Sequence, residues 1–132
     1  MIFVDASALV AIIAREPDAE ALENRLRRHL PRFTSSLALY EAALGLARLG
    51  SISVARAESM LHGFLVNAKI EVTPITAETG RIAIDAFVRY GRGNHPARLN
   101  MGDCFAYACA RSLSAPLLFK GEDFSQTDIA VA

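Results

Sequence analysis

The sequence predicts an α/β fold with a mostly parallel sheet that is covered by helices on both faces. Short runs of β-branched and aromatic residues alternate with amphipathic helical segments, which is typical of parallel strands joined by helices. The length of 132 residues fits one domain, residues 1–132. An apolar content of 52% indicates a compact chain with a real core rather than a disordered one.

Each predicted strand is a short apolar run that ends at polar or turn-forming residues. The first closes at Asp5, and Gly121 marks the turn after the last of the four main strands. The segment that follows this turn is expected to add a final edge strand. The predicted strands are residues 2–5, 32–35, 70–75, 116–119 and, at the edge, 127–131.

The predicted helices begin at residues that favour helix N-termini. Asp18 is the expected cap of a helix whose acids come early and whose bases come late, as the helix dipole favours. Thr76 is an expected cap without a full capping box, because the third residue after it is Thr79. Asn100 is expected to cap the last helix, after the loop 91–99. The predicted helices are residues 7–14, 19–30, 37–49, 54–68, 77–90 and 101–113.

Composition excludes several classes of protein. The 14 basic and 14 acidic residues cancel, which argues against nucleic-acid binding through global basicity. Two local basic clusters, at 25–32 and 81–98, remain candidates for phosphate contact or for solvated helix faces. Neither a membrane span nor a signal peptide is expected. Cys104 and Cys109 do not fit a CxxC pair or a disulfide framework, so we expect buried thiols and a cytoplasmic location.

Two acids stand where the local sequence favours apolar residues. Asp5 ends the first strand, and Asp103 lies in the first turn of a helix that is otherwise mostly apolar. An ionised carboxylate is stable in such a place only when it is hydrogen-bonded, paired or bound to a metal ion. If folding brings the two together, a hard divalent cation is the natural ligand. The alternatives are that Asp5 only caps a helix and that Asp103 only complements a helix dipole.

Further acids are expected near the same edge of the sheet. Glu122 and Asp123 follow the 116–119 strand, and ligands of open α/β sheets bind at the carboxyl ends of strands. Glu41 is the lone acid in its helix as far as Ala47. A solvated helix face for Glu41 and an ordinary loop position for Asp123 remain alternative interpretations.

With these residues in view, the chain resembles the PIN-domain family, and within it the VapC-type toxins of bacterial VapBC toxin–antitoxin modules. The segments that carry the resemblance are Met1 to Leu9, Glu41 in its apolar helix, Leu99 to Ala108, and Leu117 to Phe124 with Thr127 to Ile129. They cover essentially the whole chain in order. The resemblance implies a PIN-like three-layer α/β/α sandwich.

The resemblance also implies an activity, a cofactor and partners. The activity is that of an endoribonuclease dependent on Mg²⁺ or Mn²⁺, the toxin of a type II toxin–antitoxin system. Asp5, Glu41, Asp103 and Asp123 match the family's acidic quartet, although the adjacent Glu122 leaves the fourth acid open. Ser7 matches a small hydroxyl residue that follows the family's first acid, and is a candidate for substrate contact. An RNA substrate, a VapB-type antitoxin and a homodimer are the implied partners.

The expected mechanism follows from charge. Clustered carboxylates alone repel a phosphodiester, whereas carboxylates that hold a divalent cation attract it and allow the cation to activate water. Arg92, Arg98 and Lys120 are candidates for phosphate contact. The first alternative is a PIN-like interaction module without catalytic activity. The second is a phosphate-handling hydrolase or a receiver-like domain, in which Lys120 would assist aspartyl-phosphate chemistry.

Overall fold

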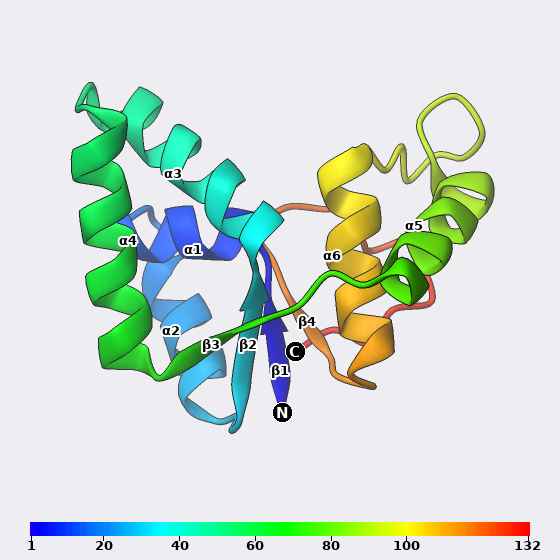
Figure 1. Ribbon diagram of the computed structural model, residues 1–132, viewed down its shortest axis with the longest axis horizontal. Helices are drawn as coiled ribbons and strands as arrows, with labels where there is room; N and C mark the ends of the chain where they lie inside the picture. Colours follow the sequence, from blue (N-terminus) through cyan, green and yellow to red (C-terminus); the bar gives the residue numbers. More distant parts are fainter.

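The computed structural model describes all 132 residues and has a sheet of four parallel strands. The order across the sheet is β3-β2-β1-β4. All four carboxyl ends therefore lie at one edge of the sheet (Figure 1), where α/β folds bind ligands. The strands are β1 (Ile2–Val4), β2 (Arg32–Ser35), β3 (Ile70–Thr73) and β4 (Leu117–Leu118).

Six helices form the two outer layers of the expected sandwich. Figure 1 shows α1 to α4 on one side of the sheet and α5 with α6 on the other. The predicted PIN-like three-layer architecture is thus confirmed. The helices are α1 (Ala6–Ile13), α2 (Ala19–Arg27), α3 (Ser36–Gly50), α4 (Val54–Ala68), α5 (Ala77–Tyr90) and α6 (Met101–Ser112).

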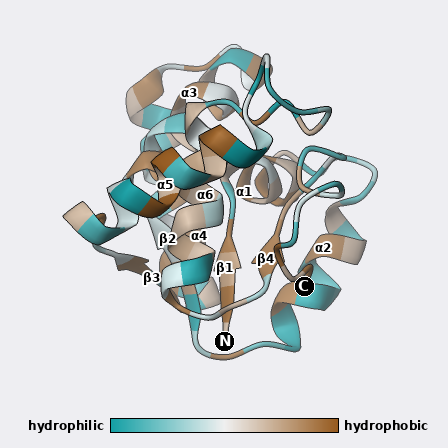
Figure 2. Cartoon of the chain, turned by 90° about the vertical axis from the view of Figure 1, so that its right-hand side faces the viewer, coloured by the Kyte–Doolittle hydropathy of each residue, from teal (hydrophilic) through white to brown (hydrophobic).

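The core is divided in two by the sheet, as the alternation of side chains along β1 shows. Ile2 and Val4 pack with α1 to α4, whereas Phe3 packs with the helices of the opposite layer. All three side chains are completely buried. Burial on both faces explains why this strand is an uninterrupted apolar run. Figure 2 shows β1 as a hydrophobic strand in the interior, with hydrophilic residues on the outer surface of α2.

Three local expectations were wrong. Asp18 precedes α2, but its side chain makes no capping hydrogen bond. Residues 127–131 do not form an edge strand, because only Val131 bridges to Leu117 beside β4. Thr76 does form a capping box with Thr79, since each side chain meets the other residue's backbone N–H. A threonine hydroxyl accepts a hydrogen bond in this position as a glutamate would, which the usual capping-box motif omits.

No single helix is both long enough and apolar enough to cross a membrane. Taken together, α3 and α4 meet that test of length and composition, but they are bent by 119° at the break between them. Cys104 and Cys109 are free and buried, as expected.

Candidate active site

Asp5 lies at the junction between β1 and α1, and its carboxylate is held in place locally. As the cap of α1, its Oδ2 accepts hydrogen bonds from the backbone N–H of Ser7 (3.1 Å) and from the Ser7 hydroxyl (2.5 Å). Only 6% of Asp5 is exposed. The cap that we considered as an alternative to a metal ligand is therefore real, but it engages one carboxylate oxygen, and Oδ1 makes no hydrogen bond.

Ser7 connects this carboxylate to the end of β4. Its hydroxyl donates to Asp5 and accepts a hydrogen bond from the backbone N–H of Lys120 at 3.0 Å. The loop that begins after β4, and that carries Asp123, is thereby fixed to the start of α1. Ser7 thus orients Asp5 and holds the loop after β4, and a contact of Ser7 with substrate stays a prediction.

Asp103 sits in the first turn of α6 and forms a capping box with Asn100. Its backbone N–H donates to Asn100 Oδ1 at 2.9 Å, and its own Oδ2 accepts from the Asn100 backbone N–H at 3.1 Å. The Asp103 side chain is half-buried. The hydrogen bond from Asn100 fixes its Oδ2, whereas its Oδ1 makes no hydrogen bond within the protein. Asn100 and Asp103 together hold the acid at the end of the helix.

Glu41 reaches the site from α3 and lies against α6. Its carboxylate occupies the space that a side chain at Gly102 would fill, so that a Cβ there would stand 2.6 Å from Glu41 Cδ. Glu41 is half-buried and makes neither a hydrogen bond nor an ion pair with the protein. A solvated helix face does not describe this position.

The four predicted acids influence one another electrostatically, as groups in one cluster do. Burial, and then the charges of Asp5 and Asp103, raise the pKa of Glu41 to about 7. Burial also raises the pKa of Asp103 to about 6, with Asp123 and Asp5 adding to the increase while the Asn100 hydrogen bond and Arg92 oppose it.

Asp5 behaves in the same way. Burial raises the pKa of Asp5, the hydrogen bonds from Ser7 oppose that effect, and the charge of Asp123 adds to it. Four segments of the chain that are far apart in sequence therefore meet at the carboxyl edge of the sheet.

Asp123, rather than Glu122, is the fourth acid that acts on the cluster. Its charge raises the pKa of both Asp5 and Asp103, whereas Glu122 contributes to neither. Both residues are exposed in the loop after β4, so their exposure does not distinguish them.

The donor set fits a hard divalent cation in its chemistry. All four side chains offer carboxylate oxygens, and none of them takes part in an ion pair. Such a group of acids is stabilised by a cation, which supplies the missing positive charge. No three of these carboxylates are arranged in this structure as a coordinating set for a metal ion.

The basic candidates are placed differently from one another. Arg92 and Arg98 line a hollow of about 480 Å³ in the loop before α6, and Arg92 lies near enough to lower the pKa of Asp103. The Lys120 ammonium instead pairs with Glu16, with Asp18 Oδ1 at 3.6 Å. Its charge is already balanced, and a phosphate contact would require exchange of these partners.

Two residues that matter here were not identified from the sequence. Gly102 makes room for Glu41, and its only sequence signal is a glycine in the first turn of a helix, where it lowers helix stability. Glu16 holds Lys120 across 104 residues of sequence, and no local motif indicates such a contact.

Comparison with known proteins identifies relatives of the whole chain. The PIN domain family model matches residues 2–130. A VapC ribonuclease of Rhizobium meliloti (strain 1021) is 40% identical over 141 aligned residues, covering 98% of this chain and 99% of the relative. Ribonuclease VapC30 of Mycobacterium tuberculosis is 41% identical, covering 96% of this chain and 95% of the relative.

A solved structure shows the same fold at lower sequence identity. The crystal structure of Mycobacterium tuberculosis VapC20, described as a Sarcin-Ricin loop cleaving toxin, superposes with a TM-score of 0.75. The match covers 100% of this chain and 98% of that chain, with 21% sequence identity. It supports the three-layer architecture independently of the sequence matches.

Proposed function

The chain belongs to the PIN-domain family and, within it, to the VapC ribonucleases, and we propose that its ribonuclease activity requires Mg²⁺ or Mn²⁺ held by Asp5, Glu41, Asp103 and Asp123. The proposal is supported by the packing of Glu41 against Gly102, next to Asp103, and by the mutual effects of four carboxylates that take no part in ion pairs. A bound Mg²⁺ would supply an acidified water and positive charge at the attacked phosphate.

The residues of the chain have distinct parts in this proposal. Asp5 and Asp103 are the fixed ligands, because a hydrogen bond to one oxygen of each leaves the other free to bind the cation. Glu41 and Asp123 lack such bonds and can adjust to the cation as it binds. Ser7 orients Asp5 and holds the loop after β4 in place.

RNA is the proposed substrate, held beside the acids by the basic loop before α6. Arg92 and Arg98 take no part in the protein's ion pairs and are both exposed, so their charges are available to phosphates. A hollow of about 490 Å³ that Glu41 helps to line is a second place where RNA could contact the site, and Ser7, Glu16 and Lys120 are among its other lining residues.

The decisive experiment compares the purified chain with Asp103→Asn on a mixed RNA pool, with Mg²⁺, with Mn²⁺ and with EDTA. Metal-dependent cleavage that Asp103→Asn abolishes, while circular dichroism and the melting temperature show an intact fold, is the expected result. Unchanged cleavage by the variant would reject the assigned site. No cleavage by the folded wild type with either metal would favour the non-catalytic interaction module.

A VapB-type antitoxin is the proposed protein partner. An apolar groove of about 420 Å³ runs between α3 and α4, and its lining includes Leu39, Tyr40, Leu44 and Leu61. Such a groove suits the apolar face of a partner helix. One wall of the groove is α3, the helix that also carries Glu41. Leu44→Arg should abolish co-purification with a co-expressed VapB-type protein and leave RNA cleavage intact.

A homodimer is the proposed assembly, and α5 offers an apolar surface for it. Ile84, Phe87 and Val88 follow helical spacing and are exposed by 68%, 46% and 65%, respectively. Figure 2 shows hydrophobic bands along α5, on the side of the molecule that faces the viewer. Size-exclusion chromatography with light scattering should show a dimer for the wild type and a monomer for Val88→Glu.

A further inference from the structure

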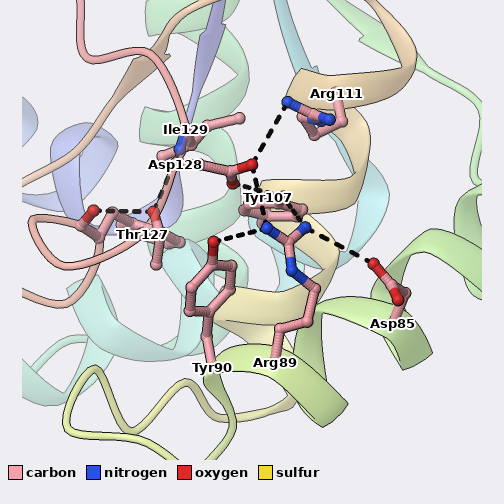
Figure 3. A network of polar contacts seen from close by, with 9 residues as sticks. Asp85, Arg89, Tyr90, Tyr107, Arg111, Thr127, Asp128 and Ile129 are labelled. Carbon is pink, nitrogen blue, oxygen red and sulfur yellow. Dashed lines mark hydrogen bonds and ion pairs between the residues drawn. The ribbon is translucent and has the colours of Figure 1, made fainter.

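A polar network on the α5–α6 side of the molecule is centred on Asp128 (Figure 3). Asp128 accepts a hydrogen bond from the Tyr107 hydroxyl at 2.7 Å and another from Arg89 Nη2 at 3.2 Å, and Arg111 lies 3.8 Å away. These bonds lower the pKa of Asp128, the Tyr107 bond most strongly. Asp128 is therefore a carboxylate with three donors around it, from two helices.

The network does not have the charge of an anion-binding site. Arg81, Arg89 and Arg111 line a hollow of about 440 Å³, but each is paired with an acid. The acids are Glu78, Asp85 and Asp128, so the charges balance. A neutral set of ion pairs that joins three segments is suited to fastening them together rather than to binding phosphate.

The network is continuous with the acidic cluster along α6. Tyr107 follows Asp103 by four residues, so the two side chains lie one helical turn apart on the same face. Tyr107 is almost fully buried, which fixes the hydroxyl that Asp128 accepts from. Any shift of Asp128 relative to Tyr107 is thus a shift relative to the helix that carries Asp103.

The same network is continuous with Asp123 along the C-terminal loop. Phe124 is buried against Phe119, with ring centroids 4.9 Å apart, and the Thr127 hydroxyl donates to the Phe124 carbonyl at 2.8 Å. The Asp123 carboxylate itself has no hydrogen bond that fixes it. Its position is therefore set by the path of the backbone between the end of β4 and Asp128.

We propose that Asp128, through the Tyr107 hydroxyl, is a positioning residue that sets the separation of Asp123 from Asp103 and thereby the affinity of the site for its divalent cation. This inference rests on the proposed function, because it takes both acids as ligands. Asp128 is remote from the carboxylates that would touch the cation, and its effect passes through the loop 123–128 and through α6.

The test is Mn²⁺ binding to RNA-free protein, followed by the electron paramagnetic resonance signal of free Mn²⁺. Asp128→Ala and Tyr107→Phe should each weaken binding by about tenfold, the lower end of what loss of a group that orients metal ligands costs. Tyr107→Phe removes only the hydroxyl and keeps the buried ring, so this variant still tests the inference if Asp128→Ala fails to fold. Asp85→Ala is the matched control, because it removes the other acid beside Arg89 without contacting the loop.

The outcomes separate this inference from the proposed function. If Asp103→Asn loses Mn²⁺ while Asp128→Ala and Tyr107→Phe melt lower but bind as the wild type does, Asp128 is only structural and the inference is overturned. If Asp103→Asn binds Mn²⁺ as tightly as the wild type, the proposed site fails, and the inference fails with it. Weaker binding by both network variants, with Asp85→Ala unchanged and cleavage restored by excess Mn²⁺, supports the inference.

Discussion

The carboxylate of Glu41 on α3 lies against the backbone of Gly102 on α6. A Cβ at residue 102 would stand 2.6 Å from Glu41 Cδ, which is closer than real Cβ contacts come. The two helices bring Glu41 beside Asp103 at the carboxyl edge of the sheet because residue 102 has no side chain. The lack of a Cβ at residue 102 therefore allows the Glu41 carboxylate to lie where it does.

Gly102→Ala should therefore impair cleavage without impairing folding. The atoms in the way are at the far end of a flexible side chain, so Glu41 can move aside at little cost in stability. Its carboxylate would then be displaced by about the width of a methyl group, and misplacement of about 1 Å can cost roughly 100-fold in rate. Initial rates of RNA cleavage measure the loss of activity, and thermal unfolding of the same preparations measures the change in stability.

Gly63→Ala is the matched control for this prediction. Gly63 is exposed on α4, and a Cβ there would meet nothing within 4 Å. Alanine at this position should stabilise the helix by about 0.5–1 kcal/mol and leave cleavage unchanged. Full activity of Gly102→Ala would show that Glu41 is not needed where the structure places it.

The two neighbouring acids after β4 should differ in their effect on cleavage. Asp123 acts on Asp5 and Asp103 electrostatically, whereas Glu122 acts on neither. Asp123→Asn should lower the cleavage rate by at least about tenfold, as expected for a group that helps to hold a cation. Glu122→Gln removes the same charge one residue away and should be neutral. The opposite ranking of the two variants would make Glu122 the fourth acid.

The sequence predicted the fold well because the signals were local. Buried strands appear as apolar runs, and helices begin at residues such as Thr76 and Asn100, whose caps the structure contains. The edge strand at 127–131 was wrong because the segment is irregular: Ile129 packs into the core, whereas Val131 is exposed and makes a single bridge to Leu117. Periodicity does not distinguish a strand from an irregular segment of so short a length.

The candidate site was predictable only in part. Asp5 and Asp103 were recognisable because each is an acid in an apolar context, and Glu41 because it is alone in its helix. The contact of Lys120 with Glu16 depends on how β4 and the loop after α1 meet in space. The choice of Asp123 over Glu122 depends on the conformation of a loop. Neither the Lys120–Glu16 contact nor the difference between Asp123 and Glu122 can be predicted from the residue types alone.

RNA affinity should depend on salt through Arg92 and Arg98. Each phosphate contact that is lost should reduce the slope of log affinity against log salt by about 0.7 for a single strand. Arg92→Gln and Arg98→Gln are therefore expected to bind less tightly at low salt and with a shallower slope. Fluorescence anisotropy with labelled RNA in EDTA, which prevents cleavage, gives both values.

Arg81→Gln provides the comparison for these variants. Arg81 is equally exposed but is paired with Glu78 on α5, away from the loop before α6. Its substitution should leave the salt slope unchanged. A slope that falls equally for all three variants would indicate diffuse electrostatic attraction rather than contacts made by this loop.

The stability of the metal-free protein should fall as the pH rises above about 4.5, and Glu41 is one of the acids responsible. Burial and the neighbouring acids raise its pKa from 4.5 to about 7, so between these values the folded protein binds more protons than the unfolded chain. The free energy of unfolding then decreases with increasing pH. The favourable contribution is complete below pH 4.5 and is lost as the pH passes about 7.

Glu41→Gln tests this prediction directly, because glutamine keeps the size of the side chain and cannot ionise. In urea unfolding with EDTA, the variant should match the wild type near pH 4 and exceed it at pH 8 by about 1–2 kcal/mol, allowing for the solvent screening of a half-buried group. Millimolar Mg²⁺ should stabilise the wild type at pH 8 more than the variant, since only the wild type presents all four carboxylates to the cation. A wild type that is equally stable at both pH values in EDTA would contradict the uncompensated charge on which the metal site depends.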